Sequence, residues 1–160
     1  MITVYEIHPD GLTVAPSPTA GCWINVLEAT QEDAAQLEAW GFPSHYITYA
    51  LDPGERARIE HSQGVTLIVF LIPHAKPTPI DTPYATVPLG ILITESNIVT
   101  ICCTRSHILR DIAAGKIADM PTVRKRQFIL RLLLRISDIT RRPDPVVTSP
   151  DQALTQVVRL

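Results

Sequence analysis

Few glycines and the lack of any long apolar run are the first features of this 160-residue sequence. The longest apolar stretch, Val65–Pro73, is broken by a threonine and is far shorter than the ~20 residues a membrane-spanning helix needs. The start of the chain carries Thr3, Glu6 and Asp10 in place of a basic and then an apolar segment, which argues against a signal peptide. With only 7 glycines the chain has little material for a phosphate-binding loop, and no such motif occurs. We therefore expect no membrane span, no leader and no nucleotide-binding loop.

Cysteines are also few: there are three, an odd number, and Cys102 and Cys103 are adjacent. Neighbouring residues of a strand point to opposite faces, so these two thiols are poorly placed to pair with each other. Cys22, like the other two, lies in an apolar stretch that predicts a strand, where a thiol is usually an inert part of the core. We expect reduced thiols, as in a cytosolic protein.

The histidines lack the spacing of a metal site. No two of them lie three or four residues apart, and no Cys-x-x-Cys pair is present, so the ligand pattern of a zinc site is missing. We interpret each histidine as a surface or capping side chain. The five are His8, His45, His61, His74 and His107.

One short stretch alternates acidic and basic side chains and is the best place in the sequence to look for an acid–base pair. Asp52, Glu55 and Glu60 lie there beside Arg56 and Arg58. Because the alternation predicts a strand, we interpret these side chains as a solvated, cross-paired surface. We predict no catalytic and no cofactor-binding residue, and nothing in the residues supports an enzyme.

Charge is distributed unevenly along the chain. Residues 1–60 carry nine acidic and two basic side chains, whereas residues 103–160 carry five acidic and eleven basic ones. Such halves can attract each other within a chain or between copies. With a pI near 6.2 and few aromatic residues, the basic end does not predict a nucleic-acid partner, and we interpret it as the wet face of a helix. Its basic residues are Arg124, Lys125, Arg126, Arg131, Arg135, Arg141 and Arg142.

Hydrophobic patterning predicts a mixture of strands and helices. We expect an edge strand at Ile2–Ile7, a central strand buried on both faces at Val65–Ile72, and a loop at His74–Pro83, which holds three prolines after its first residues. The other expected strands are Gly21–Leu27, Arg56–His61, Val87–Thr94 and Ile98–Cys103. The expected helices follow Thr30 up to Gly41, run from Pro43 to Leu51, and run from Ser106 to Ala114.

A longer helix is expected from Pro121 to about Arg142, with an apolar arc too wide for a helix that packs on one side only. Either the domain surrounds this helix or a partner helix completes its burial. We expect the chain to self-associate through Leu132, Leu133 and Ile136 on this helix. Three prolines follow it, and a capping box then predicts one last helix that ends at Leu160.

The order of several sequence blocks resembles a known family. Asp-Pro-Gly-Glu-Arg-x-Arg-x-Glu begins at Asp52, Pro-Leu-Gly-Ile begins at Pro88, and the helix 126–138 comes last. Trp-Ile-Asn-Val at Trp23 precedes these blocks, and Ile-Val-Thr-Ile at Ile98 lies between the second block and the helix. Over about residues 23–139, the chain resembles the cytosolic N-terminal domain of the CorA family of magnesium and cobalt transporters, in the form common in Gram-positive bacteria.

The resemblance implies an α+β fold in which helices sandwich a mixed β-sheet. It implies an αβα cytosolic domain at 1–122, the start of a long stalk helix at 123–142, and a proline-broken tail with a short helix at 143–160. The implied function is that of a cytosolic regulatory domain of a divalent cation (Mg²⁺/Co²⁺) transporter, which senses the cation and organises the subunits.

The resemblance also implies partners and a location. Family members are homopentamers at the cytoplasmic face of the cell membrane, held to it by C-terminal helices that this soluble chain lacks. Regulatory Mg²⁺ is bound weakly, between neighbouring subunits. Asp81 is the only carboxylate of the loop expected to carry ligands, and we interpret it as a solvated loop acid, so the metal-binding residues stay unassigned.

Two alternatives stay open beside this interpretation. One is the zinc-transporting branch of the same superfamily, and the other is a stand-alone soluble adaptor that has lost its transport half. The chain has no Gly-Met-Asn signature and nothing like the two membrane helices of the family, so by itself it cannot conduct ions. The reading frame downstream of Leu160 distinguishes the alternatives, since a transporter would continue into two apolar segments of ~20 residues.

Overall fold

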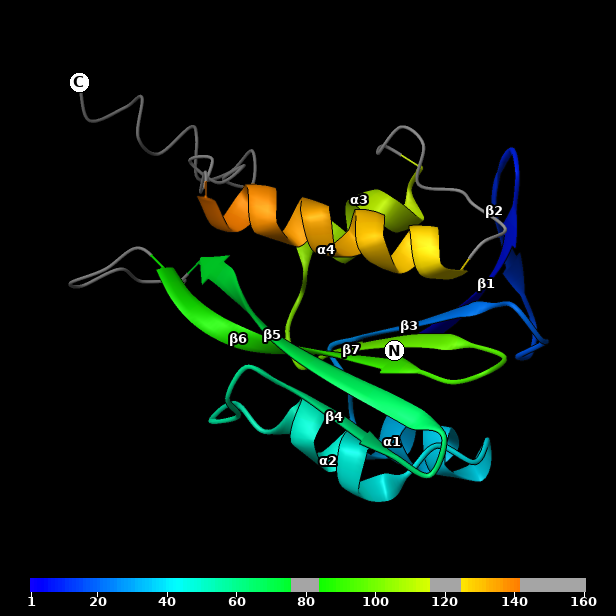
Figure 1. Ribbon diagram of the computed structural model, residues 1–160, viewed down its shortest axis with the longest axis horizontal. Coiled ribbons are helices and arrows are strands. Elements are labelled where there is room, and N and C mark those ends of the chain that lie inside the picture. Colours follow the sequence, from blue (N-terminus) through cyan, green and yellow to red (C-terminus); the bar gives the residue numbers. More distant parts are fainter. Residues whose placement is uncertain (76–83, 116–124, 142–160) are drawn as a thin grey trace.

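A mixed β-sheet with helices on both faces forms the structure, which is a computed structural model (Figure 1). It describes residues 1–75, 84–115 and 125–141. The strands in these ranges are β1 (Ile2–His8), β2 (Gly11–Ala15), β3 (Trp23–Leu27), β4 (Arg58–Ser62), β5 (Val65–Ala75), β6 (Tyr84–Ile93) and β7 (Ile98–Cys102). The helices are α1 (Gln31–Ala39), α2 (Ser44–Leu51), α3 (His107–Ala113) and α4 (Lys125–Arg141).

The seven strands lie in the order β2-β1-β3-β7-β6-β5-β4. All neighbouring strands are antiparallel except β3 and β7, which pair in parallel from Trp23 opposite Ile98 to Leu27 opposite Cys102. Parallel strands cannot be joined by a tight turn and need a long connection. Here that connection contains α1, α2 and the strands β4 to β6.

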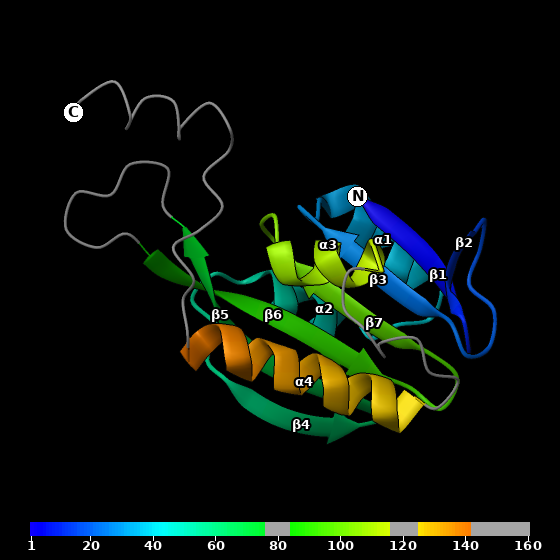
Figure 2. The same ribbon diagram turned by 90° about the horizontal axis from the view of Figure 1, so that it is seen from above.

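The chain leaves the two parallel strands toward opposite faces of the sheet. After β3 it enters α1 and α2 on one face, and after β7 it enters α3 and then α4 on the other, as Figures 1 and 2 show. Each helix pair closes its own apolar core against the sheet, around Leu37 and Tyr46 on the first face and around Leu109 and Phe128 on the second. The structure therefore confirms the α+β fold with a mixed sheet between helices.

The predicted starts of α1 and α3 are confirmed by their capping contacts. The Thr30 hydroxyl accepts a hydrogen bond from the Asp33 amide at 3.2 Å, and the Asp33 carboxylate accepts one from the Thr30 amide at 2.9 Å. Ser106 caps α3 in the same way, accepting from the Leu109 amide at 3.3 Å. Gly41 follows α1 with φ of +89°, a left-handed conformation that glycine adopts at little cost.

Two predictions about strand position were wrong. Ile2–Ile7 was expected at an edge, but β1 lies between β3 and β2, because the His-Pro-Asp-Gly turn folds Gly11–Ala15 back as an additional edge strand. Val65–Ile72 was expected in the centre, but β5 is next to the edge strand β4. Its apolar character has another cause: α2 lies on one side of the sheet and α4 on the other, so both faces of β5 are covered.

The predicted loop at His74–Pro83 begins later than expected. β5 continues to Ala75 and pairs with β6, so that His74 lies opposite Ala85. The prolines of this stretch favoured the prediction of a loop. Pairing of β5 with β6 nevertheless extends the hairpin beyond Pro73. Residues 76–83, which include Asp81, lie outside the described residues, as do Pro121 and the helix expected to end at Leu160.

Gly90 of β6 sets how closely α2 approaches the sheet. A Cβ at this position would overlap the Ala50 Cβ, and the Ala50 Cα would lie 3.2 Å away. We predict that Gly90→Ala lowers the free energy of unfolding by about 1–3 kcal/mol, because the helix backbone has to move. Gly11→Ala is the control: nothing lies within 4 Å of its Cβ, and we expect a change below about 1 kcal/mol. Urea unfolding measures both, and equal stabilities of the two variants would contradict the close contact.

Candidate functional site

The acidic and basic residues around Arg58 form a surface ion-pair cluster, as the alternation indicated. Arg58 contacts the Glu55 carboxylate at 2.6 Å and that of Glu60 at 3.4 Å, and its guanidinium lies 4.4 Å from the centre of the Tyr49 ring. Asp52 is exposed and accepts from the Gly54 amide, which fixes the turn after α2. These contacts hold α2 to β4.

The cysteines are free thiols. Cys22 and Cys102 are buried, and Cys103 is half-buried. Burial raises the pKa of the Cys22 and Cys103 thiols, which lowers the fraction of reactive thiolate.

Three of the histidines make local side-chain contacts, and a fourth lies in a strand. His8 and His61 hydrogen-bond across their hairpins to Thr13 and Thr66, at 3.0 and 2.8 Å, and the His45 ring contacts the Tyr46 ring at a tilt of 54°. His74 lies in β5. Within residues 1–75, 84–115 and 125–141, no three histidine, cysteine or acidic side chains come together as a metal site. None of the helices in these ranges is both long and apolar enough to cross a membrane.

Helix α4 uses its wide apolar arc in two ways. Phe128, Leu132 and Ile136 are buried against the sheet, so two of the three residues that we expected to contact a partner are covered by the domain itself. That assignment of Leu132 and Ile136 was wrong, because these residues lie on the side of α4 that faces the sheet. Leu130 and Leu134, one helical turn apart, are 58% and 56% exposed. We call these two residues the outer leucine strip.

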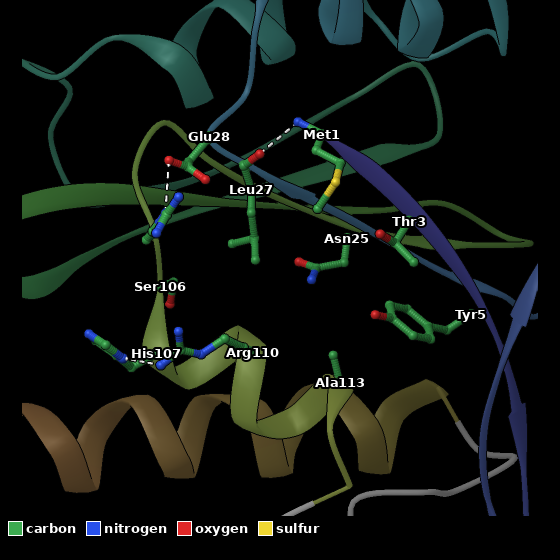
Figure 3. A pocket seen from close by; sticks show the side chains of 11 residues that line it. Met1, Thr3, Tyr5, Asn25, Leu27, Glu28, Ser106, His107, Arg110 and Ala113 are labelled. Atoms are coloured by element: carbon green, nitrogen blue, oxygen red, sulfur yellow. Dashed lines mark hydrogen bonds and ion pairs between the residues drawn. The ribbon is translucent and has the colours of Figure 1, made fainter. Parts of the chain in front are cut away.

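A pocket of about 330 Å³ lies on the α3 side of the sheet, at the carboxyl ends of β3 and β7. Thr3 and Tyr5 of β1 and Asn25 of β3 line it from the sheet, as Figure 3 shows. Arg110 of α3, with His107 and Ala113, lines the side opposite the sheet.

Three buried side chains form a hydrogen-bond relay beside this pocket. The Trp23 indole donates to the Thr100 hydroxyl at 2.9 Å, and that hydroxyl donates to the Asn25 Oδ1 at 2.9 Å. An indole N–H can only donate and a hydroxyl has one hydrogen, so the direction of the relay is fixed. The Asn25 carbonyl must face Thr100, and its Nδ2 group must face the pocket, where Figure 3 shows it.

The rim of the pocket is positively charged and held by neighbouring groups. Arg105 pairs with Glu28 at 3.0 Å, which ties together the segments that follow β3 and β7. Glu28 has φ of +48°, a conformation that costs energy in a residue with a side chain. Arg110 donates to the His107 Nδ1 at 2.7 Å, so that nitrogen carries no proton. Partial burial, and next the charge of Arg110, hold the His107 pKa below its usual range.

Sequence reasoning missed this pocket. Two polar residues inside apolar strands, Asn25 and Thr100, were the available signal, because a polar side chain at a buried strand position needs a partner. Nothing in the sequence indicated a role for Arg110, because basic residues are common in short helices.

The comparisons with known proteins agree with the fold. The family model for CorA-like Mg²⁺ transporter proteins matches residues 19–141. The chain belongs to this family. No curated protein sequence matches the chain.

Solved structures share the fold at low sequence identity. The CorA magnesium transporter of Methanocaldococcus jannaschii has a TM-score of 0.69 and 18% identity, over 89% of this chain and 46% of its own. The soluble domain of the same CorA has a TM-score of 0.67 and 20% identity, over 86% and 56%. The ZntB cytoplasmic domain of Vibrio parahaemolyticus RIMD 2210633 has a TM-score of 0.67 and 9% identity, over 85% and 57%. This CorA-family chain thus spans about half the length of these structures.

The environment of His107 predicts how its titration responds to substitution. The positive charge of Arg110 lowers the His107 pKa and the negative charge of Asp111 raises it. We therefore expect Arg110→Ala to raise the pKa toward the ordinary value near 6.5, and Asp111→Asn to lower it further. An NMR titration of the imidazole measures both shifts, and shifts of the same sign in the two variants would contradict this account.

The same low pKa has a consequence for stability. Between the native pKa of His107 and about 6.5, the unfolded chain binds the proton more readily than the native chain does. This group therefore lowers stability as the pH falls through that window and has no such effect at higher pH.

Proposed function

We propose that this chain is the cytosolic regulatory domain of a CorA-like divalent cation transporter, where it senses the cation and organises the subunits. The observation that carries the proposal is α4: one side of this helix anchors it to the sheet, and the other exposes the outer leucine strip. Membership of the family over residues 19–141 supports the assignment to a cation transporter. The proposed location is the cytoplasmic face of the cell membrane.

The outer leucine strip is suited to contact with a second copy of the chain. Adjacent exposed leucines on a helix form an apolar strip that gains free energy when a neighbouring subunit covers it. The homopentamer that the family resemblance implies supplies such a neighbour, and α4 is then the proposed start of the stalk. The uneven charge of the chain favours the same arrangement, since the acidic and basic parts of adjacent copies attract.

The cation specificity is part of the proposal. Mg²⁺ or Co²⁺ is the proposed cation, by analogy with the family, and zinc is the alternative because the ZntB cytoplasmic domain shares the fold. A stand-alone adaptor without a transport half is the third possibility, and the reading frame after Leu160 distinguishes it from a transporter.

We predict weak self-association that depends on the outer leucine strip. Leu134→Glu places a charge in the contact and should weaken association about 10- to 100-fold. This factor corresponds to the ~1.5–3 kcal/mol that burial of one leucine side chain contributes. Sedimentation equilibrium over a range of concentrations measures the change. Val14→Glu is the matched control, because Val14 is 71% exposed on β2, at the opposite edge of the sheet from β4.

Two results would count against this surface. A native chain that stays monomeric at high concentration would show that the strip is not a contact between copies. Association that Val14→Glu weakens as much as Leu134→Glu would show a nonspecific effect of added charge.

We predict that magnesium alone stabilises the single chain very little. Mg²⁺ binds through one or two carboxylates and keeps several waters, and the proposed regulatory site takes its carboxylates from two subunits, so one subunit offers half a site. Ligand at 100 times its dissociation constant would add ~2.7 kcal/mol to the stability. Thermal unfolding in millimolar MgCl₂, against NaCl of equal ionic strength, measures the difference. A saturable increase specific to Mg²⁺ would show that one subunit contains the whole sensor site.

A further inference from the structure

The pocket lies where the topology of the sheet opens a crevice. β3 and β7 are adjacent and parallel, and the chain leaves them toward opposite faces. In open sheets such a reversal separates the two connections and leaves a ligand crevice outside the carboxyl ends of the strands. Leu27 and Glu28 at the end of β3, and Arg105 after β7, line the pocket from those ends.

The pocket also gathers the buried asparagine, threonine and serine residues. In the part of the chain that the structure describes, these are Asn25, Thr100 and Ser106, and all three lie here. Thr100 is satisfied by the relay, and Ser106 by the capping contact with α3. Asn25 is only 4% exposed, and no acceptor among the described residues meets its Nδ2 group. An amide donor that opens onto a cavity can be met there by water or by an acceptor of a ligand.

The rest of the lining indicates which acceptor fits. Arg110 contributes a full positive charge. Its hydrogen-bond partner is the His107 Nδ1, which is not an acid, so this contact does not neutralise the charge. The Tyr5 hydroxyl points into the same space, as Figure 3 shows. Leu27 and Ala113 contribute apolar surface to the same pocket. A bare inorganic anion would use the donors and leave this apolar surface uncovered.

We propose that this pocket binds a small organic carboxylate. Its carboxylate accepts hydrogen bonds from the Asn25 amide and pairs with Arg110, and its carbon skeleton packs on Leu27 and Ala113. Thr100 is a positioning residue, because it holds the Asn25 amide in the orientation that donates to the ligand. The site is contained in one copy of the chain and does not depend on the proposed transport function.

Succinate is a suitable probe, and NMR of the whole chain is a suitable measurement. We expect succinate to shift the Asn25 side-chain amide signals saturably. Arg110→Gln should weaken binding at least about tenfold, because a charge-assisted contact is lost. This substitution is on an exposed helix position and leaves the core intact. Arg56→Gln is the matched control: it removes one exposed positive charge near α2, away from the pocket, and should leave the affinity unchanged.

The role of Thr100 has its own readout. Thr100→Val removes the group that orients Asn25, so we expect weaker succinate binding together with altered Asn25 amide shifts in the ligand-free protein. Arg110→Gln should leave those ligand-free shifts close to the native ones. The proposal therefore does not depend on whether the valine variant folds.

Three results would overturn the proposal. The first is no saturable shift at Asn25, which would mean that the pocket holds solvent only. The second is a response that NaCl of equal ionic strength reproduces, or that Arg110→Gln leaves unchanged. The third is inorganic phosphate binding as tightly as succinate, which would show that charge alone is recognised and that the apolar surface has no part.

Discussion

The parallel pairing of β3 with β7 is the constraint on which the rest of the structure depends. Two adjacent parallel strands end on the same side of the sheet, and the chain needs a separate connection after each of them. Here one connection covers one face with α1 and α2, and the other covers the opposite face with α3 and α4. The separation of the two cores and the crevice between the connections follow from this one pairing.

The two faces of the sheet differ in chemistry. On the α1 and α2 face the core is apolar apart from the hydroxyl of the buried Tyr46. On the other face, a row of polar residues crosses three strands, since Thr3 lies opposite Asn25 and Asn25 lies opposite Thr100. Burying such a row costs free energy unless each group is paired. The structure pairs Thr100 on both sides and directs the remaining donors of Asn25 toward the pocket, so the polarity of this face is concentrated where a ligand can use it.

Local features of the fold were predictable because they depend on neighbours in the sequence. Thr30 and Ser106 cap their helices through groups three residues away, and the β6–β7 hairpin closes over a four-residue turn. Strand order was not predictable from patterning, because burial on two faces is the same signal at the centre of a sheet and next to its edge. β5 illustrates this, since helices on both sides produce its apolar run.

The pocket could not be predicted from the sequence either, because it too depends on how distant segments are arranged. Asn25 and Arg110 are 85 positions apart, and only the parallel pairing of β3 with β7 places the start of α3 over β3. The outer leucine strip could be predicted only in part. The width of the apolar arc of α4 indicated that packing on one side would leave apolar residues uncovered, as Leu130 and Leu134 are, but which leucines face the sheet depends on how the helix is rotated about its axis. Contact with Trp23 through Phe128 fixes that rotation, at 5.3 Å between the ring centres.

Trp23 contacts both the residue that anchors α4 to the sheet and the relay beside the pocket. Its ring contacts Phe128 of α4 on one side and stacks on Tyr5 at 5.0 Å on the other, while its indole N–H starts the relay that orients Asn25. A contiguous path of contacts is not by itself energetic coupling, which requires an element with two arrangements. Coupling, where it exists, is reciprocal. If occupancy of the pocket changes the association of α4 by some factor, association must change the affinity of the pocket by the same factor. Trp23 is fully buried in a close-packed core, so a second arrangement of its ring would require its neighbours to move as well.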